Sequence, residues 1–210
     1  MKIYQRLLIL FLPIVVILSN FLFLANNHNI YDSIYKKEKI YKNFQSKIEV
    51  ENATKALLGY FRGNNQLDIN FYSTQAQIHL RDVKKLIKIT QLIDIVAVIS
   101  LVTTIAWMLY KKDFSGIKKS VVISTTLIFA LIALIAILLL SNFDKSFIIF
   151  HKILFKNDFW LFPPEDNLIK LFPEAFFIAF AKQLAMNILV SQVVLLFLTN
   201  LLPKNDPTTN

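Results

Sequence analysis

The sequence contains no cysteine among its 210 residues. Disulfide bonds, thiolate catalysis and cysteine-ligated metal sites are therefore excluded. Glycine is scarce as well, with three residues, whereas 55% of the chain is hydrophobic and the mean hydropathy is +0.52. A soluble domain is less apolar than this, and a disordered chain lacks such patterning. The composition therefore indicates an integral membrane protein.

Acidic residues are also in short supply, since 14 Asp and Glu face 23 Lys and Arg, for a net charge of +9. A basic chain can indicate nucleic-acid binding, but here the lysines are spread over short connections between apolar segments. Basic residues in such connections set the orientation of a membrane protein and contact anionic lipid. We therefore expect no nucleic-acid partner.

Four apolar segments are long enough to cross a hydrocarbon core of about 30 Å at about 1.5 Å per residue. The expected spans cover residues 7–25, 89–110, 120–141 and 176–202. The first has no small-x-small cleavage site and exceeds the apolar core of a signal peptide, so we expect it to be retained. Pro13 is expected to kink it.

The connection between the second and third spans fixes the predicted orientation. Lys111, Lys112, Lys118 and Lys119 face only Asp113 there, which is typical of the cytoplasmic side. Both termini are then cytoplasmic. Residues 26–88 form an extracytoplasmic cap, and residues 142–175 form an extracytoplasmic interfacial loop.

The cap is predicted to contain both helix and strand. A helix is expected over Val50–Phe61, ended by Gly63, Asn64 and Asn65. Leu67–Ile78 alternates partly and carries β-branched and aromatic residues, which favours a short strand or extended arm. The predicted fold class is an all-α membrane protein with four transmembrane helices and a small extracytoplasmic α+β cap.

The stretch Phe150–Phe177 mixes aromatic residues with one histidine, charges of both signs and three prolines. The charges rule out a span, while so much apolar surface in a hydrated loop indicates a membrane, ligand or partner contact. We interpret it as an interfacial re-entrant or surface segment. Asp166 or Asn167 is expected to cap a short helix, and Pro173 to precede the fourth span.

Two histidines lie at the predicted outer ends of different spans. On a helix, Asp82 shares a face with His79 at i+3 and is expected to accept an imidazole N–H. The alternative is that His79 and His151 are interfacial residues without a chemical role, surrounded by snorkelling basic side chains.

Polar residues inside the spans have two expected uses. Asp94 is costly in an apolar segment, and Lys182 is its candidate ion-pair partner. Gln183, Asn187 and Ser191 share one helical face, which favours helix packing over substrate binding.

The motifs IHLRDVKKLI, from Ile78, and FHKILFKNDFWLFPPEDNLIKLFPEAFF, from Phe150, are separated by two spans and a short basic connection. In these motifs and in its four-span layout the chain resembles the bacterial lipoprotein intramolecular transacylases, the Lit family. The family's His-x-x-Asp-Val-Lys motif matches from His79, and its Phe-His-x-x-Leu-Phe motif matches from Phe150. A Trp and a Leu-x-Pro-Glu-x-Phe-Phe motif follow in the same order. The sequence departs from the family pattern at residues 163–166, PPED, where an Asp-Pro turn is expected.

The resemblance implies an acyltransferase of the bacterial cell membrane that uses no cofactor or metal. Its partners would be membrane lipid and a lipoprotein whose N-terminal cysteine carries a diacylglyceryl thioether and a free α-amine. The sn-2 acyl chain would move to that amine and give the N-acyl, monoacylglyceryl lyso form. The resemblance leaves acyl-chain preference and oligomeric state open.

Aminolysis of an ester needs a base for the amine proton, an acid for the leaving alkoxide and stabilisation of the oxyanion. Two imidazoles with an ordinary pKa of about 6.5 suit these roles at neutral pH. We therefore predict His79 and His151 as the catalytic pair at the outer leaflet, with the base unassigned. The predicted supporting residues are Arg81, Asp82, Lys84, Asn157 and Asp158. The residues predicted to contact lipid or substrate are Phe150, Phe155, Trp160 and Phe176.

Three other classes are weighed against this hypothesis. A membrane accessory or interaction protein would use the histidines only as interfacial residues. A metalloenzyme would combine both histidines with Asp82 or Glu174, although no HExxH-type spacing is present. A transporter is disfavoured because the spans hold few polar residues and no repeat.

Overall fold

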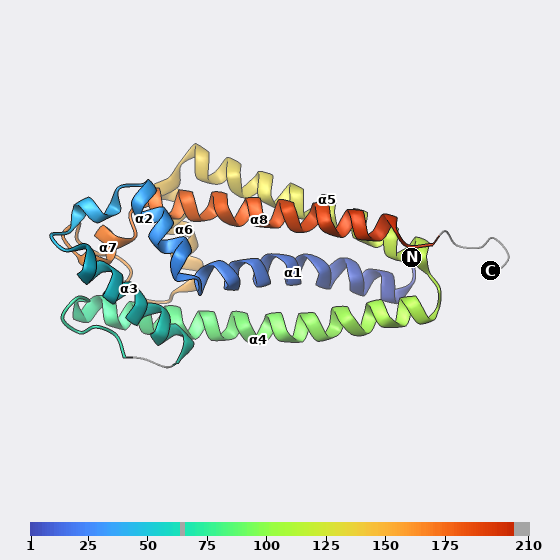
Figure 1. The fold of residues 1–210 in the computed structure, drawn as a ribbon, viewed down its shortest axis with the longest axis horizontal. Helices are drawn as coiled ribbons and strands as arrows, with labels where there is room; N and C mark the ends of the chain where they lie inside the picture. The colour runs from blue at the N-terminus through green and yellow to red at the C-terminus, as the bar shows by residue number, and fades with distance from the viewer. Residues whose placement is uncertain (64–65, 204–210) are drawn as a thin grey trace. The chain divides into compact units, whose positions relative to one another are not determined.

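The computed structural model describes residues 1–63 and 66–203, which contain helices and no strand. The sequence expectation for Asn64 and Asn65 lies outside the described residues. The elements are α1 (Ile3–Ala25), α2 (His28–Lys37), the 3₁₀ helix η1 (Ile40–Asn43), α3 (Lys47–Arg62), α4 (Thr74–Tyr110), α5 (Phe114–Ser141), α6 (Phe143–Leu154), α7 (Asn167–Leu171) and α8 (Glu174–Asn200) (Figure 1).

The α+β character predicted for the cap is wrong. Instead of forming a strand, Phe71 and Tyr72 pack into a core, at 3% and 1% exposure. Ser73 then starts α4, because its Oγ accepts the N–H of Ala76 at 3.1 Å. The alternation of apolar and polar residues across this stretch therefore reflects two buried rings followed by a capped helix.

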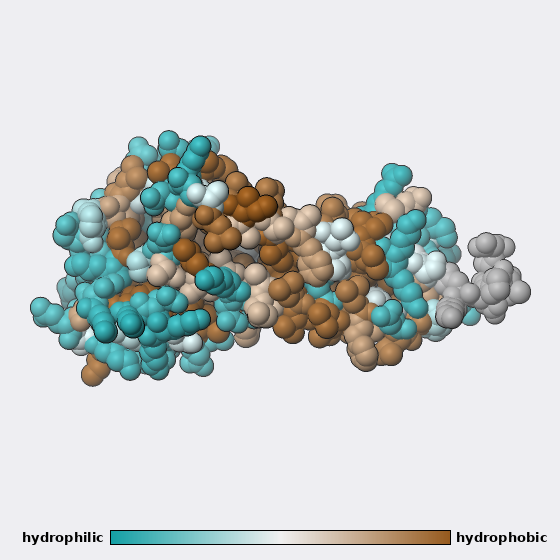
Figure 2. Space-filling model, turned by 90° about the horizontal axis from the view of Figure 1, so that it is seen from above, coloured by the Kyte–Doolittle hydropathy of each residue, from teal (hydrophilic) through white to brown (hydrophobic). Residues whose placement is uncertain are grey.

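The chain forms two compact units. The span unit comprises Met1–Phe21, Thr90–Ala136 and the residues from Ala185 onward, and the cap unit comprises Leu22–Ile89 and Ile137–Leu184. Four helices, α1, α4, α5 and α8, are long and apolar enough to cross a membrane. They carry many exposed apolar side chains, such as Ile99 at 60% and Val193 at 66%, and Figure 2 shows apolar residues gathered over the long helices. Lipid is the environment in which such faces are stable.

Hydrogen bonds between helices hold the span unit together. Ser19 Oγ donates to both carboxylate oxygens of Asp94, at 3.0 and 3.1 Å. This contact corrects the expected ion pair with Lys182, because a hydroxyl on α1 satisfies the carboxylate instead. Asn20 Nδ2 donates to Ser191 Oγ at 3.3 Å, which confirms a helix-packing role for Ser191.

The cap unit has its own aromatic core. Its fully buried residues include Tyr35 and Leu57 from α2 and α3, Tyr72 and Ala76 around the start of α4, and Leu171 from α7. The expected helix lies within α3, which Ser46 caps through a 3.3 Å contact with Glu49 N–H. Gly63 ends it at φ 92°, a left-handed conformation that favours glycine. The core therefore joins the cap helices to the start of α4.

The connection between α4 and α5 depends on one carboxylate and one glycine. Asp113 caps α5 by accepting the Gly116 N–H at 3.0 Å, and it also accepts from Gln5 Nε2 of α1 at 3.0 Å. A Cβ on Gly116 would lie 2.4 Å from Asp113 Oδ2 and 2.5 Å from Gln5 Nε2. Glycine is therefore required for the cap and for the attachment of α1.

We expect Gly116→Ala to destabilise the protein by about 1–3 kcal/mol, because the added methyl group displaces Asp113 from both partners. The measurement is thermal unfolding of the purified protein in detergent. Lys119→Ala, on the exposed side of the same helix, is the matched control and should unfold like the wild type. Equal unfolding temperatures for the glycine variant and the wild type would contradict this account.

Candidate active site

One face of α4 carries the residues that organise the site. Gln75, His79 and Asp82 recur at i, i+4 and i+7, so they point to the same side of the helix. The capping contact of Ser73 fixes where this helix begins. All three residues lie before Lys88, and therefore outside the apolar segment that starts at residue 89.

The segment 155–166, here named the aromatic loop, is bonded along this face. Gln75 Nε2 donates to the carbonyl oxygens of Leu161 at 2.7 Å and Phe159 at 3.3 Å. Asn157 Nδ2 donates to Asp82 Oδ2 at 3.0 Å. Ser73 Oγ donates to Asp166 Oδ2 at 2.6 Å, and Asp166 caps α7 as expected. These side-chain bonds attach the aromatic loop to α4 on both sides of His79.

His151 lies in the last turn of α6, just before the aromatic loop. Its carbonyl accepts the Phe155 N–H at 2.8 Å, which ends the helix. Its Nδ1 lies 2.8 Å from the Phe147 carbonyl oxygen. A carbonyl only accepts, so Nδ1 carries the hydrogen, and Nε2 of the neutral ring keeps the free electron pair.

The structure brings His79 and His151 together, with ring centroids 6.0 Å apart and ring planes inclined at 32°. Phe155 lies against both imidazoles, at 4.9 Å from His79 and 5.6 Å from His151. Trp160 lies 4.9 Å from His151, and Phe162 lies 5.7 Å from His79. Each histidine is 7% exposed. The two imidazoles therefore share an aromatic, largely dry enclosure.

Burial lowers the pKa of both histidines. The pKa of His79 falls to about 4, mainly because burial disfavours the charged ring, with a further reduction from His151 and a partial opposite effect of Asp82. Burial also lowers the pKa of His151, against the opposing effect of its bond to Phe147. Nδ1 of His79 is buried without a hydrogen-bond partner. At neutral pH both rings are therefore uncharged, and Nδ1 of His79 has no hydrogen-bond partner.

Asp82 does not bond to His79 as expected. Lys85 Nζ donates to one of its oxygens at 2.9 Å and Asn157 to the other. These two hydrogen bonds lower the pKa of the Asp82 carboxyl. Asp82 therefore bonds to the aromatic loop through Asn157, and its contribution to the pKa of His79 is through its charge.

The other predicted residues are divided between the site and its surroundings. Phe150 is 56% exposed beside His151, at a ring separation of 5.4 Å. Lys84 lies with Nζ 3.7 Å from the centroid of the Tyr60 ring. Arg81 is exposed and, two residues after His79, points to a different side of α4. Asp158 is exposed on the aromatic loop.

The lipid contact expected for Phe176 does not fit its position. The side chain is 4% exposed and packs against Tyr31 and Tyr35 in the cap core. Since α8 starts at Glu174, Phe176 lies in its first turn, on the side of the helix that faces the cap core.

Sequence reasoning missed Gln75 and Phe147. Gln75 lies within the expected strand Leu67–Ile78, and a strand assignment hides its i, i+4 relation to His79. Phe147 acts through its backbone carbonyl, so only its spacing of four residues before His151 indicated the contact. Among the described residues, no group of three or more His, Asp or Glu lies close enough to hold a metal ion.

A family model, the lipoprotein intramolecular transacylase Lit, matches residues 6–177. The chain belongs to this Lit family. The structure also resembles that of the membrane-integral Lit from Bacillus cereus, with a TM-score of 0.84 at 23% identity over 95% of this chain and 94% of that one. Variants of that protein with one histidine replaced by alanine or arginine match with TM-scores of 0.80 and 0.75, at 24% and 26% identity. They cover 95% and 94% of this chain, respectively, and 91% of theirs.

No curated protein sequence matches the chain. Membership of the Lit family makes the protein an acyltransferase, a lipoprotein intramolecular transacylase. With four candidate spanning helices and a membrane-integral relative, it is a multi-pass protein of a bacterial membrane.

We expect the His79 imidazole to remain neutral at about pH 5.5, where an exposed histidine is mostly protonated. The folded pKa of about 4 lies below the ordinary 6.5, so the unfolded chain binds more protons between these values. Folding stability should therefore fall as the pH drops through this window. Nitrogen NMR of histidine-labelled protein, with His79 assigned through His79→Asn, measures the midpoint. A midpoint at 6.5 or above would refute the dry environment.

Proposed function

We propose that this transacylase moves the sn-2 acyl chain of a diacylglyceryl-cysteine lipoprotein to its own N-terminal α-amine through the His79–His151 pair. The observation that supports this most directly is the meeting of two buried, neutral imidazoles at 6.0 Å from separate helices. At this separation both rings can reach a common ester group, directly or through one water. The lipoprotein is the substrate that the family implies.

The hydrogen bond of His151 to Phe147 favours His151 as the base. With Nδ1–H donated to the carbonyl, Nε2 is the nitrogen that accepts the proton of the attacking amine. His79 is then the group that delivers a proton to the leaving glyceryl oxygen. The amine nitrogen forms the amide bond and loses its proton to Nε2 of His151, and His151 passes a proton to His79. His79 then releases a proton to the glyceryl oxygen as the ester bond breaks. Both rings finish the cycle neutral, as they began.

No acyl-enzyme is required in this scheme. The amine and the ester belong to one molecule, so the enzyme needs only to hold them in a reactive geometry. Lowered pKa values keep both imidazoles in the neutral form that a base needs at neutral pH. The exposed side chains of Phe150, Ile153 and Phe159, at 56%, 76% and 42%, supply apolar surface for acyl chains.

We place the pair on the extracytoplasmic side of the membrane. The basic connection at residues 111–119 favours a cytoplasmic location for that end of α4 and α5. Residues 26–88 and 142–175 are then outside, where mature lipoproteins present their acylated cysteine. Both termini are cytoplasmic in this arrangement.

We expect His79→Ala and His151→Ala each to lower formation of the lyso form by roughly 100-fold or more, the usual contribution of a general acid or base. Mass spectrometry of lipoprotein N-terminal peptides from cells expressing each variant measures the product. His28→Ala replaces the one other histidine and should behave like the wild type. Wild-type product levels in either variant of the pair would refute the assignment.

We expect Asn157→Ala to lower lyso-form production by about fivefold, because one charge-assisted hydrogen bond of about 1 kcal/mol or more holds the aromatic loop on α4. The Asp82→Ala and Asn157→Ala effects should not add in the double variant, since both remove the same contact. Lys156→Ala, an exposed neighbour, is the control. Fully additive losses would show that the two residues act separately.

A further inference from the structure

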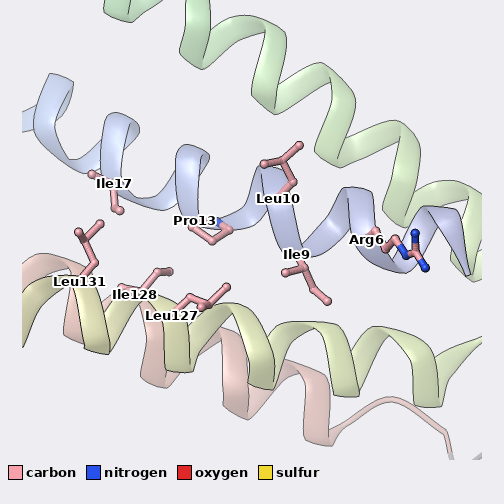
Figure 3. Close-up of a pocket in the computed structure, with 8 residues that line it drawn as sticks. All are labelled: Arg6, Ile9, Leu10, Pro13, Ile17, Leu127, Ile128 and Leu131. Carbon is pink, nitrogen blue, oxygen red and sulfur yellow. The ribbon is translucent and has the colours of Figure 1, made fainter. Parts of the chain in front are cut away.

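The span unit contains an apolar groove that the proposed reaction does not use. It has a volume of about 340 Å³ and lies between α1 and α5. Its α1 wall includes Ile9, Pro13 and Ile17, and its α5 wall includes Leu127, Ile128 and Leu131, with Arg6 at one end (Figure 3). The groove therefore combines an apolar channel with a single cationic end.

The length of the groove matches one leaflet. Arg6 and Ile17 are eleven residues apart on α1, so they are separated by about 16 Å at about 1.5 Å per residue. This is about half of a hydrocarbon core of about 30 Å. Ile128 is fully buried at the floor, whereas Leu127 and Leu131 are 51% and 40% exposed at the rim. An acyl chain can therefore enter from the side and lie along the groove.

Pro13 shapes the groove. Its ring nitrogen has no hydrogen, so the carbonyl of Ile9 loses its helical donor. The Ser124 hydroxyl of α5 approaches this oxygen at 3.5 Å, but its single hydrogen has a nearer acceptor, the Ser120 carbonyl oxygen at 2.9 Å. The proline ring lines the groove beside this carbonyl.

Arg6 directly precedes the apolar segment at residues 7–25, which places it at headgroup depth. Its side chain is exposed, and no carboxylate of the described residues forms an ion pair with it. Asp113, the acidic residue of the nearby connection, is occupied by Gln5, Gly116 and Lys2. A guanidinium presents paired donors that match two oxygens of a phosphate.

We propose that this groove is a binding site for one anionic phospholipid of the leaflet at the basic end of the span unit. The phosphate binds the Arg6 guanidinium, and one acyl chain fills the groove between α1 and α5. The lipid is a bound structural ligand and not the acyl donor. The site is complete within the span unit and does not depend on the histidine chemistry.

The test uses the full-length protein purified in detergent and titrated with phosphatidylglycerol or phosphatidylcholine of the same acyl chains. Native mass spectrometry measures bound lipid, and thermal unfolding measures stabilisation. We expect phosphatidylglycerol to bind more tightly and to raise the unfolding temperature more. Arg6→Gln should weaken phosphatidylglycerol binding by about fivefold, the effect of one basic residue at an anionic surface.

Leu127→Trp, which fills the groove, should weaken binding of both lipids. Arg62→Gln, an exposed arginine of the cap unit, and Val122→Trp, an exposed residue of α5 outside the groove, are the matched controls and should bind like the wild type. Equal affinity for the two lipids, or no effect of Arg6→Gln, would overturn the proposal. A dimer that Leu127→Trp dissociates would also overturn it, because a second copy would then occupy the groove.

Discussion

The bond between the aromatic loop and α4 is the contact on which the site depends. The two histidines are 72 positions apart in the chain, and their elements meet because Gln75 and Asp82 bind the loop on either side of His79. The bonds from Gln75 are made to backbone carbonyls, so they fix the path of the loop whatever its side chains are. This path places Phe155 beside His79 and Trp160 beside His151. The start of α4 and the end of α6 therefore contribute one histidine each to the same aromatic enclosure.

The enclosure stabilises the neutral form of both imidazoles, but it reduces the stability of the folded protein. Aromatic packing removes water from both imidazoles, and the desolvation lowers their pKa values. The same packing leaves Nδ1 of His79 without a partner, which costs free energy in the folded protein. In the proposed reaction this nitrogen is free to bond with a group of the substrate. The stability lost at this atom is consistent with a site arranged for a ligand.

Sequence patterns predicted what depends on local chemistry. The four apolar segments, the helix ended by Gly63 and the cap at Asp166 follow from length, backbone freedom and side-chain hydrogen bonding. The prediction of a strand before α4 is wrong, because burial of Phe71 and Tyr72 in the cap core determines the conformation of this stretch. The predicted partner of Asp82 is wrong, because Lys85 and Asn157, the latter distant in sequence, bond to its two oxygens. Contacts between distant segments cannot be read from spacing.

The proposed reaction accounts for how few polar groups the site holds. An enzyme that joins two separate substrates must bind both, whereas in the proposed reaction the amine and the ester belong to one molecule, so the substrate itself supplies their proximity. The protein then needs a neutral base with a fixed tautomer, a second imidazole and an apolar wall for acyl chains. His151 bonded to Phe147, His79 and the exposed Phe150 meet these needs. Under the proposed mechanism a chain without cysteine can support acyl transfer, because that mechanism requires no covalent nucleophile.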